Sequence, residues 1–340
     1  MKTNTPSIIT QFAKDIDGGL SSTPKTLPSR YFYDAIGDKL FQQIMRMPEY
    51  YLTDCEFEIF EQQRSDIINT IYTGRKFNLV ELGAGDGLKT KLLLEYLVKN
   101  EIDFEYFPVD ISANILEQLE SDLRTRWPSL KVTTLNYEYF EALEQLNKIE
   151  DSPKVILFLG SNIGNFTPNR AQRFFSRLEE LISPQDFLLS GIDLKKNPRT
   201  ILKAYDDAQG ITRNFNLNLL TRINRELGAN FILDQFEHYA TYNPENGEAR
   251  SYLMSTCAQE VYIDVLEKSF SFVQAEPIHT EISRKYNPEE IKFLANETGF
   301  KVVKNFTDSR EYFTDTLPQS DGISQKCYTI YKSVPYPSLV

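Results

Sequence analysis

Between residues 77 and 192, short apolar segments alternate with segments of helical periodicity, and this alternation restricts the fold more than any other feature of the sequence. The short segments resemble buried strands in length and content, whereas the longer ones repeat apolar residues at helical spacing. Strands that alternate with helices are joined by right-handed crossovers and lie parallel in one sheet. The sequence therefore predicts an α/β fold with a mainly parallel sheet.

The expected strands of this part are residues 77–82, 104–111, 130–135, 155–159 and 187–192, and the expected helices are 88–98, 112–123 and 168–182. A capping box at residues 53–56 predicts a further helix that continues to Gly74. After residue 286, a helix over 287–298 and strands over 300–306 and 326–331 would add an antiparallel pair to the sheet.

Residues 196–285 interrupt the alternation. Residues 199–229 are mostly helical, whereas 231–283 contain strand-like segments such as 250–258 and 270–273. The chain of 340 residues also exceeds a typical domain of roughly 100–200 residues. We therefore expect two domains, one formed by 61–195 and 286–340 and an α+β domain formed by 1–60 and 196–285.

Composition excludes several functional classes. A formal net charge of -11, with no basic stripe, disfavours nucleic acid as a partner. No apolar run approaches the ~18 residues that span a membrane, and no secretory signal opens the chain. The three separate cysteines (Cys55, Cys257 and Cys327) and only two histidines predict neither disulfides nor a zinc site. We expect a cytoplasmic protein that acts on a small molecule without a metal.

A glycine-rich turn, residues 80–87, follows the first expected strand and leads directly into a helix. Glycine permits positive φ and lets the backbone approach a ligand closely. The turn alone also fits a dinucleotide-binding loop or a purely structural one. Glu81 at the end of the first strand, Asp110 at the end of the second and Asn136–Tyr137 after the third make a ligand site the stronger interpretation.

This succession is similar to class I methyltransferases, whose sheets also close with an antiparallel pair of strands. In that fold, acids at the first two strand ends lie near the cofactor, and the second acid accepts hydrogen bonds from the ribose hydroxyls. The third strand end contacts the adenine. The likeness implies a Rossmann-like sheet that binds S-adenosylmethionine.

Further segments carry a closer resemblance, in this order along the chain: 32–34, 47–53, 158–165, 204–207, 224–229 and 280–286. Together they closely resemble the histidine-specific Nα-methyltransferases of ergothioneine biosynthesis, over nearly the whole chain from about Pro24. The resemblance implies a class I methyltransferase domain and a substrate-binding domain built from the N-terminal segment and the insertion. It also implies trimethylation of L-histidine to hercynine.

The resemblance assigns roles to individual residues. The cofactor would be bound by Gly83, Lys89, Asp110, Asn136 and Tyr137. The amino acid would be held by Tyr50, Asn165, Tyr205, Glu281 and Ser283, with Gly160 and the catalytic Tyr33 near the reacting amine. The chain departs from the family at Asn136, where aspartate is frequent, at Leu52, where proline is usual, and at Ser251, where methionine is common.

The assigned side chains suit free histidine. Asn165 and Tyr205 would donate hydrogen bonds to the α-carboxylate. Glu281 and Ser283 are two residues apart, so they share one face of a strand and match an imidazole that has one donor and one acceptor. In-line methyl transfer needs mainly positioning and a neutral amine, and Tyr33 is a candidate to receive the released proton.

Other interpretations remain open. Each tyrosine taken alone could be a packed aromatic residue, Lys89 a solvent-facing helix residue, and Glu281 with Ser283 an exposed strand face. At the level of function, the alternatives are a same-family N-methyltransferase for another amino acid, such as a tryptophan derivative, and a non-catalytic S-adenosylmethionine-binding module. The acidic composition disfavours RNA or protein substrates. The sequence does not predict the oligomeric state.

Overall fold

The computed structural model describes residues 10–149 and 152–320 of the chain. The chain divides into two compact units, which are Met1–Thr53 with Lys195–Lys285, and Asp54–Leu194 with Tyr286–Val340. Among the described residues, no helix is long and apolar enough to cross a membrane.

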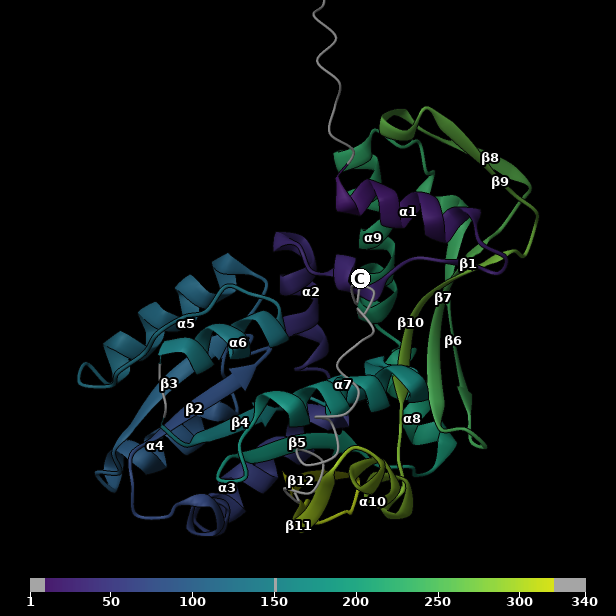
Figure 1. Ribbon diagram of the computed structural model, residues 1–340. Coiled ribbons are helices and arrows are strands. Elements are labelled where there is room, and N and C mark those ends of the chain that lie inside the picture. Colours follow the sequence, from purple (N-terminus) through teal and green to yellow (C-terminus); the bar gives the residue numbers. More distant parts are fainter. Residues whose placement is uncertain (1–9, 150–151, 321–340) are drawn as a thin grey trace, which may run out of the picture. The chain divides into compact units, whose positions relative to one another are not determined.

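The second of these units, which we call the sheet unit, contains six strands in the order β11-β12-β5-β4-β2-β3 (Figure 1). The strands are β2 (Phe77–Leu82), β3 (Phe104–Val109), β4 (Lys154–Phe158), β5 (Phe187–Asp193), β11 (Phe300–Thr307) and β12 (Phe313–Ser320). β2 to β5 pair in parallel, whereas β12 is antiparallel to both β5 and β11. The chain reverses its direction of travel across the sheet between β3 and β4, so β2 and β4 flank a topological switch point.

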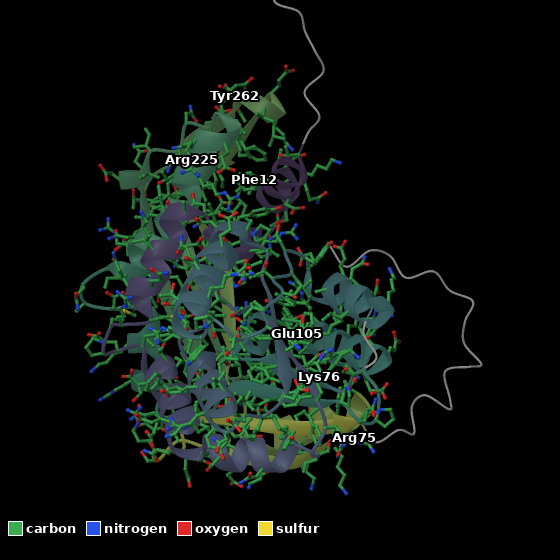
Figure 2. All side chains as sticks on the ribbon, turned by 90° about the vertical axis from the view of Figure 1, so that its left-hand side faces the viewer. Phe12, Arg75, Lys76, Glu105, Arg225 and Tyr262 are labelled. Carbon is green, nitrogen blue, oxygen red and sulfur yellow. The ribbon has the colours of Figure 1, made fainter. Side chains whose placement is uncertain are left out.

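The helices of the sheet unit are α3 (Tyr51–Ile71), α4 (Thr90–Lys99), α5 (Ala113–Arg126), α6 (Tyr139–Ile149), α7 (Pro168–Leu181) and α10 (Pro288–Glu297), with the short 3-10 helix η2 (Asn162–Asn165). α6, α7 and α10 bury apolar side chains in one cluster with β2 to β5. Every residue of β2 and β4 is buried, as expected for central parallel strands covered on both faces. A surface ion pair joins Lys76 and Glu105 at 3.6 Å (Figure 2).

The predicted strand over 130–135 forms only isolated parallel bridges, which pair Tyr106 with Val132 and Val109 with Leu135. The backbone bonds run from Tyr106 N–H to Lys131 and from Leu135 N–H to Pro108, at 3.0 and 2.9 Å. Pro108 has no N–H, so one bond of the ladder cannot form. The outer edge of the sheet is therefore an interrupted strand.

Two further sequence predictions need correction, and one lies outside the described residues. The expected helix cap at Thr53 lies inside the first turn of α3, which begins at Tyr51. The helix expected from residue 88 begins at Thr90, and α6 was not predicted. The expected strand over 326–331 lies outside the described residues, and β12 is the strand that pairs with β11.

The other unit, which we call the insertion unit, has a sheet in the order β1-β10-β7-β6 and a separate β8-β9 hairpin. Its strands are β1 (Lys25–Thr26), β6 (Phe236–Asn243), β7 (Glu248–Ser255), β8 (Gln259–Ile263), β9 (Lys268–Phe272) and β10 (Pro277–Arg284). Its helices are α1 (Gln11–Ser21), α2 (Ala35–Ile44), α8 (Pro198–Tyr205) and α9 (Ile211–Leu227), with the 3-10 helices η1 (Ser29–Phe32), η3 (Leu233–Gln235) and η4 (Asp264–Leu266). An apolar core formed by α1, α9 and the strands holds it together.

The segment over residues 32–34 has a structural role because of the contacts of Asp34. Its carboxylate caps α2 by accepting the N–H groups of Ile36 and Gly37, and it pairs with Arg225 of α9 at 2.6 Å. Burial raises the pKa of Asp34, but hydrogen bonds from Gly37 and Arg225 outweigh burial and leave it below its ordinary value. The segment that carries Tyr33 is thereby fixed to α9.

The domain boundaries in the structure fall after residues 53, 194 and 285, whereas those predicted from the sequence fall after 60, 195 and 285. The first difference arises because the boundary lies in the first turn of α3. The periodicity of a continuous helix gives no signal for such a boundary.

Candidate active site

The glycine turn of the sheet unit has the backbone conformation that its sequence requires. Gly83, Gly85 and Gly87 have φ values of 78°, 54° and 65°. A Cβ at Gly83 would lie 3.1 Å from the Tyr139 hydroxyl, and one at Gly87 would lie 2.8 Å from Leu119. Because L side chains rarely adopt this φ, the turn depends on glycine and leaves its backbone accessible at the switch point.

Asp110 connects the second strand end to this turn. Its Oδ2 accepts the Gly85 N–H at 3.1 Å and its Oδ1 accepts the Ser112 N–H at 2.9 Å. Asn136 donates from Nδ2 to the Asp110 carbonyl at 2.9 Å, and the neighbouring Tyr137 is exposed. Burial raises the pKa of Asp110, although the backbone donors partly offset it. The structure thus brings four of the five predicted cofactor residues to one strand edge.

Glu81 does not belong to this accessible group. It is 3% exposed, and its carboxyl accepts hydrogen bonds from Thr90 Oγ1 at 2.5 Å and from the Tyr106 hydroxyl. Burial raises the pKa of Glu81 to about 7, against the lowering effect of both hydroxyls. Glu81 therefore braces the turn from inside the protein.

Lys89 is not a solvent-facing helix residue, which was the alternative interpretation of its position. Its ammonium pairs with the carboxylate of Glu56, which is fully buried on α3. Glu56 also accepts the Gly160 N–H, at 2.9 and 3.1 Å from its two oxygens. Burial lowers the pKa of Lys89, but the negative charge of the adjacent Glu56 raises it by more. The pKa therefore stays above its ordinary value, and the ammonium stays charged. Glu56 links the glycine turn to the loop after β4.

Asp315 of β12 adds a second buried carboxyl beside Glu56. Burial and the negative charge of Glu56 raise the pKa of Asp315 well above its ordinary value. Gly191 makes room for both acids, because a Cβ there would lie 2.1 Å from Glu56 Oε1 and 3.2 Å from Asp315 Oδ1. Asn165 ends η2 in the same loop that Glu56 holds through Gly160.

The insertion unit carries Tyr205, Glu281 and Ser283. The Tyr205 hydroxyl donates to Ser283 Oγ at 2.7 Å, and Lys285 donates to both oxygens, at 2.6 and 2.9 Å respectively. Ser251 of β7 is the cross-strand partner of Glu281. Burial of the carboxyl raises the pKa of Glu281 to about 7, and the charge of Lys285 opposes the rise. A polar face therefore lies on β10.

Tyr33 and Tyr50 lie in an aromatic cluster of the same unit. The Phe41 ring is 5.6 Å from the Tyr33 ring and 6.4 Å from the Tyr50 ring, and the Phe215 ring is 5.7 Å from that of Tyr33. Arg222 donates to the Tyr33 carbonyl at 3.1 Å. The packed-aromatic interpretation thus holds for both rings, and it leaves the predicted roles of their hydroxyls as predictions.

The strand order, the antiparallel β12 between β5 and β11, and the glycine turn at the switch point define an S-adenosylmethionine-dependent methyltransferase of class I. The turn and Asp110 fit this cofactor, because each Asp110 oxygen accepts one backbone N–H and retains capacity for a second donor such as a ribose hydroxyl.

The chain belongs to the family described as "Histidine-specific methyltransferase, SAM-dependent", which matches residues 12–320. It is 36% identical over 295 residues to the histidine N-alpha-methyltransferase of Mycolicibacterium smegmatis, covering 87% of this chain and 90% of the relative. The enzyme of the same name from Mycobacterium tuberculosis is 33% identical over the same shares of the two chains. Ergothioneine biosynthesis protein 1 of Neurospora crassa is 28% identical over 99% of this chain and 37% of its own length. The expected fold class, enzyme class and cofactor are confirmed.

Three residues of these clusters were not predicted as site residues from the sequence: Glu56, Asp315 and Lys285. Glu56 was interpreted as part of a helix cap, and Lys285 appeared only within the segment over 280–286. The two-residue spacing of Glu281, Ser283 and Lys285 was the signal that could have identified the lysine, because all three share one face.

Proposed function

We propose that the protein transfers methyl groups from S-adenosylmethionine to the α-amino nitrogen of L-histidine, up to three times, and so forms hercynine for ergothioneine biosynthesis. The observation that carries this proposal is the polar face of β10. Glu281, Ser283 and the Tyr205 hydroxyl are gathered there in a chain that belongs to the histidine-specific family.

An imidazole suits this face better than an indole does. A neutral imidazole has one donor and one acceptor nitrogen, which pair with the Glu281 carboxylate and the Ser283 hydroxyl. An indole has one donor and no acceptor, so it would leave a buried polar group unsatisfied, at a cost of about 1–3 kcal/mol. The chemistry of the face supports histidine over the tryptophan derivatives.

We assign the cofactor to the sheet unit and the amino acid mainly to the insertion unit. Bound S-adenosylmethionine supplies an electrophilic methyl group. Asn165 would orient the substrate through its α-carboxylate. Tyr205 donates its hydroxyl proton to Ser283, so it would act on the substrate through Ser283 and not through the carboxylate. Tyr33 would receive the proton that the ammonium must lose before the nitrogen attacks. The Tyr33 ring would also favour the growing cationic head of the methylated amine.

The test is to incubate the purified protein with S-adenosylmethionine and each common amino acid separately, and to record mass gains of successive methyl groups. We expect products with one, two and three methyl groups on histidine. Methylation of tryptophan or phenylalanine should be much slower. Preferred methylation of an amino acid without a ring donor would refute the histidine assignment. Binding of S-adenosylmethionine without any methylation would instead support a non-catalytic module.

We further propose that the protein works in the cytoplasm and has no nucleic-acid or membrane partner. The free thiols of Cys55 and Cys257 and the net charge of -11 support this proposal.

A further inference from the structure

Lys285 follows β10 directly and has no solvent-exposed surface. Its ammonium donates to Tyr205 Oη at 2.6 Å and to Ser283 Oγ at 2.9 Å, and it lies 4.7 Å from the centre of the Tyr205 ring. A buried ammonium is costly to desolvate, so a protein retains one where its charge or its hydrogen bonds are needed. The proposed function gives Lys285 no role of its own.

The contacts of Lys285 determine what Ser283 offers to a ligand. A hydroxyl has one proton to donate and two lone pairs that accept. Ser283 Oγ accepts from the Tyr205 hydroxyl at 2.7 Å and from Lys285 at 2.9 Å, so both lone pairs are in use. What Ser283 has left to offer is its proton. Such a hydroxyl binds an unprotonated ring nitrogen and rejects a protonated one.

Lys285 also acts on Glu281, four residues earlier on the same face. Burial raises the pKa of Glu281 to about 7, and Lys285 is the charged group that lowers it. Without the ammonium, the carboxyl would hold its proton to a higher pH. With it, Glu281 is available as an acceptor for a ring N–H near neutral pH.

We propose that Lys285 is a specificity-determining positioning residue, which makes Ser283 a donor and keeps Glu281 an acceptor, so that the site binds neutral imidazole with one protonated and one unprotonated nitrogen. This inference rests on the proposed function. The competing arrangement is an imidazolium between Glu281 and Ser283, which would require Ser283 to accept.

The first test uses the parent protein and so does not depend on the folding of any variant. Histidine labelled with 15N in the ring is bound in the presence of S-adenosylhomocysteine at about pH 7.5, above the pKa of about 7 of Glu281, so that the carboxyl is ionised and able to hold an imidazolium. We expect the 15N spectrum of bound histidine to show one protonated and one unprotonated ring nitrogen. Two protonated nitrogens in the bound state would overturn the inference.

The second test measures histidine affinity between about pH 6 and about pH 9, again with S-adenosylhomocysteine. Lys285→Met should weaken binding roughly tenfold near neutral pH and should move the loss of affinity on acidification to higher pH. Lys285→Arg, which keeps the charge and the donors, should restore most of both. Lys203→Met is the matched control, because Lys203 is an exposed lysine on α8, the helix that ends at Tyr205.

A weakening by Lys285→Met with an unchanged pH dependence would mean that the lysine is merely structural, and unchanged affinity would mean that it has no role; either result overturns the inference. If Lys285→Met does not fold, the neutral Lys285→Gln is measured in the same way. Failure of the proposed function is distinguishable, because the parent would then neither bind nor methylate histidine. If the parent protein methylates histidine but binds it as imidazolium, the proposed function stands and only the proposed role of Lys285 is wrong.

Discussion

The glycine turn of the sheet unit and the polar face of β10 offer different kinds of group to a ligand. Around the turn, the accessible groups include backbone positions with positive φ and the carboxylate of Asp110, which is itself held by backbone N–H groups. On β10, the groups are side chains that hold one another, through the bonds among Tyr205, Ser283 and Lys285. The first arrangement depends on conformation and the second on the protonation of a few atoms.

This difference implies different sensitivities. A site made by backbone conformation tolerates changes of surrounding side chains but not of its glycines or of the acid that holds them, Asp110. A site made by coupled side chains changes its preference when one donor or acceptor is altered. The changes below test this contrast, beginning with the largest expected effect.

Asp110→Ala should raise the dissociation constant of S-adenosylmethionine at least about 100-fold. Two hydrogen bonds to an ionised acceptor are worth about 1.5–3 kcal/mol each, and the variant also loses the anchor of Gly85. Calorimetric titration measures the change. Asp103→Ala is the control, because Asp103 is an exposed acid just before the opposite end of β3. If Asp110→Ala binds S-adenosylmethionine as tightly as the parent, then Asp110 is not a cofactor-binding residue.

Glu81→Gln should alter the pH dependence of folding. The pKa of Glu81 is about 7 in the folded protein against an ordinary 4.5, so its stabilising contribution is full below the ordinary value and is lost as the pH rises through about 7. Between about pH 5 and about pH 8 the parent should lose on the order of 2–3 kcal/mol more unfolding free energy than the variant. Urea unfolding at both pH values checks this, and equal losses would contradict it.

Glu281→Ala should lower kcat/KM for histidine at least roughly tenfold, about 1.4 kcal/mol of transition-state stabilisation, and improve the ratio for tryptophan or phenylalanine. A hydrogen-bonding site discriminates strongly, whereas an apolar pocket discriminates weakly. Steady-state kinetics with the three amino acids measure the ratio. Glu237→Ala on β6 is the control, since Glu237 is exposed. Full histidine activity in Glu281→Ala would defeat the assignment.

Ser251→Ala should have the smallest effect. The Ser251 hydroxyl is buried opposite Glu281 and has no hydrogen-bond partner among the described residues, so its removal should raise the free energy of unfolding by up to about 1 kcal/mol. Histidine kcat/KM should change less than about threefold, because the ring is assigned to Glu281 and Ser283. A tenfold loss of activity would show that Ser251 also contacts the substrate.

The sequence was sufficient for features that depend on local pattern. Strand ends at Gly83, Asp110 and Asn136 follow from alternating periodicity, and the paired spacing of Glu281 and Ser283 follows from the two-residue repeat of a strand. The roles of the individual side chains came from the resemblance, and those roles remain predictions.

What the sequence did not reveal depends on partners far along the chain. Glu56 matched a helix cap, but in the structure it is buried against Gly160, 104 residues away. Lys285 carries a charge that local pattern assigns to the surface, but in the structure it is buried against Tyr205, 80 residues away. Periodicity specifies a face and does not specify which residues cover it.

The missing N–H of Pro108 has a consequence for the dynamics of the cofactor edge. Residues 131–135 are held to β3 by fewer backbone bonds than join β2 to its neighbours, so their amide hydrogens should exchange with solvent sooner than those of β2. Asn136 and Tyr137, which are predicted to contact the adenine, follow this loosely held segment, so this part of the edge is able to open locally without unfolding the unit. Binding of the cofactor at this part of the edge would slow the amide hydrogen exchange of the segment, even though the segment is far from the methyl group. The nucleotide could then enter without movement of the glycine turn.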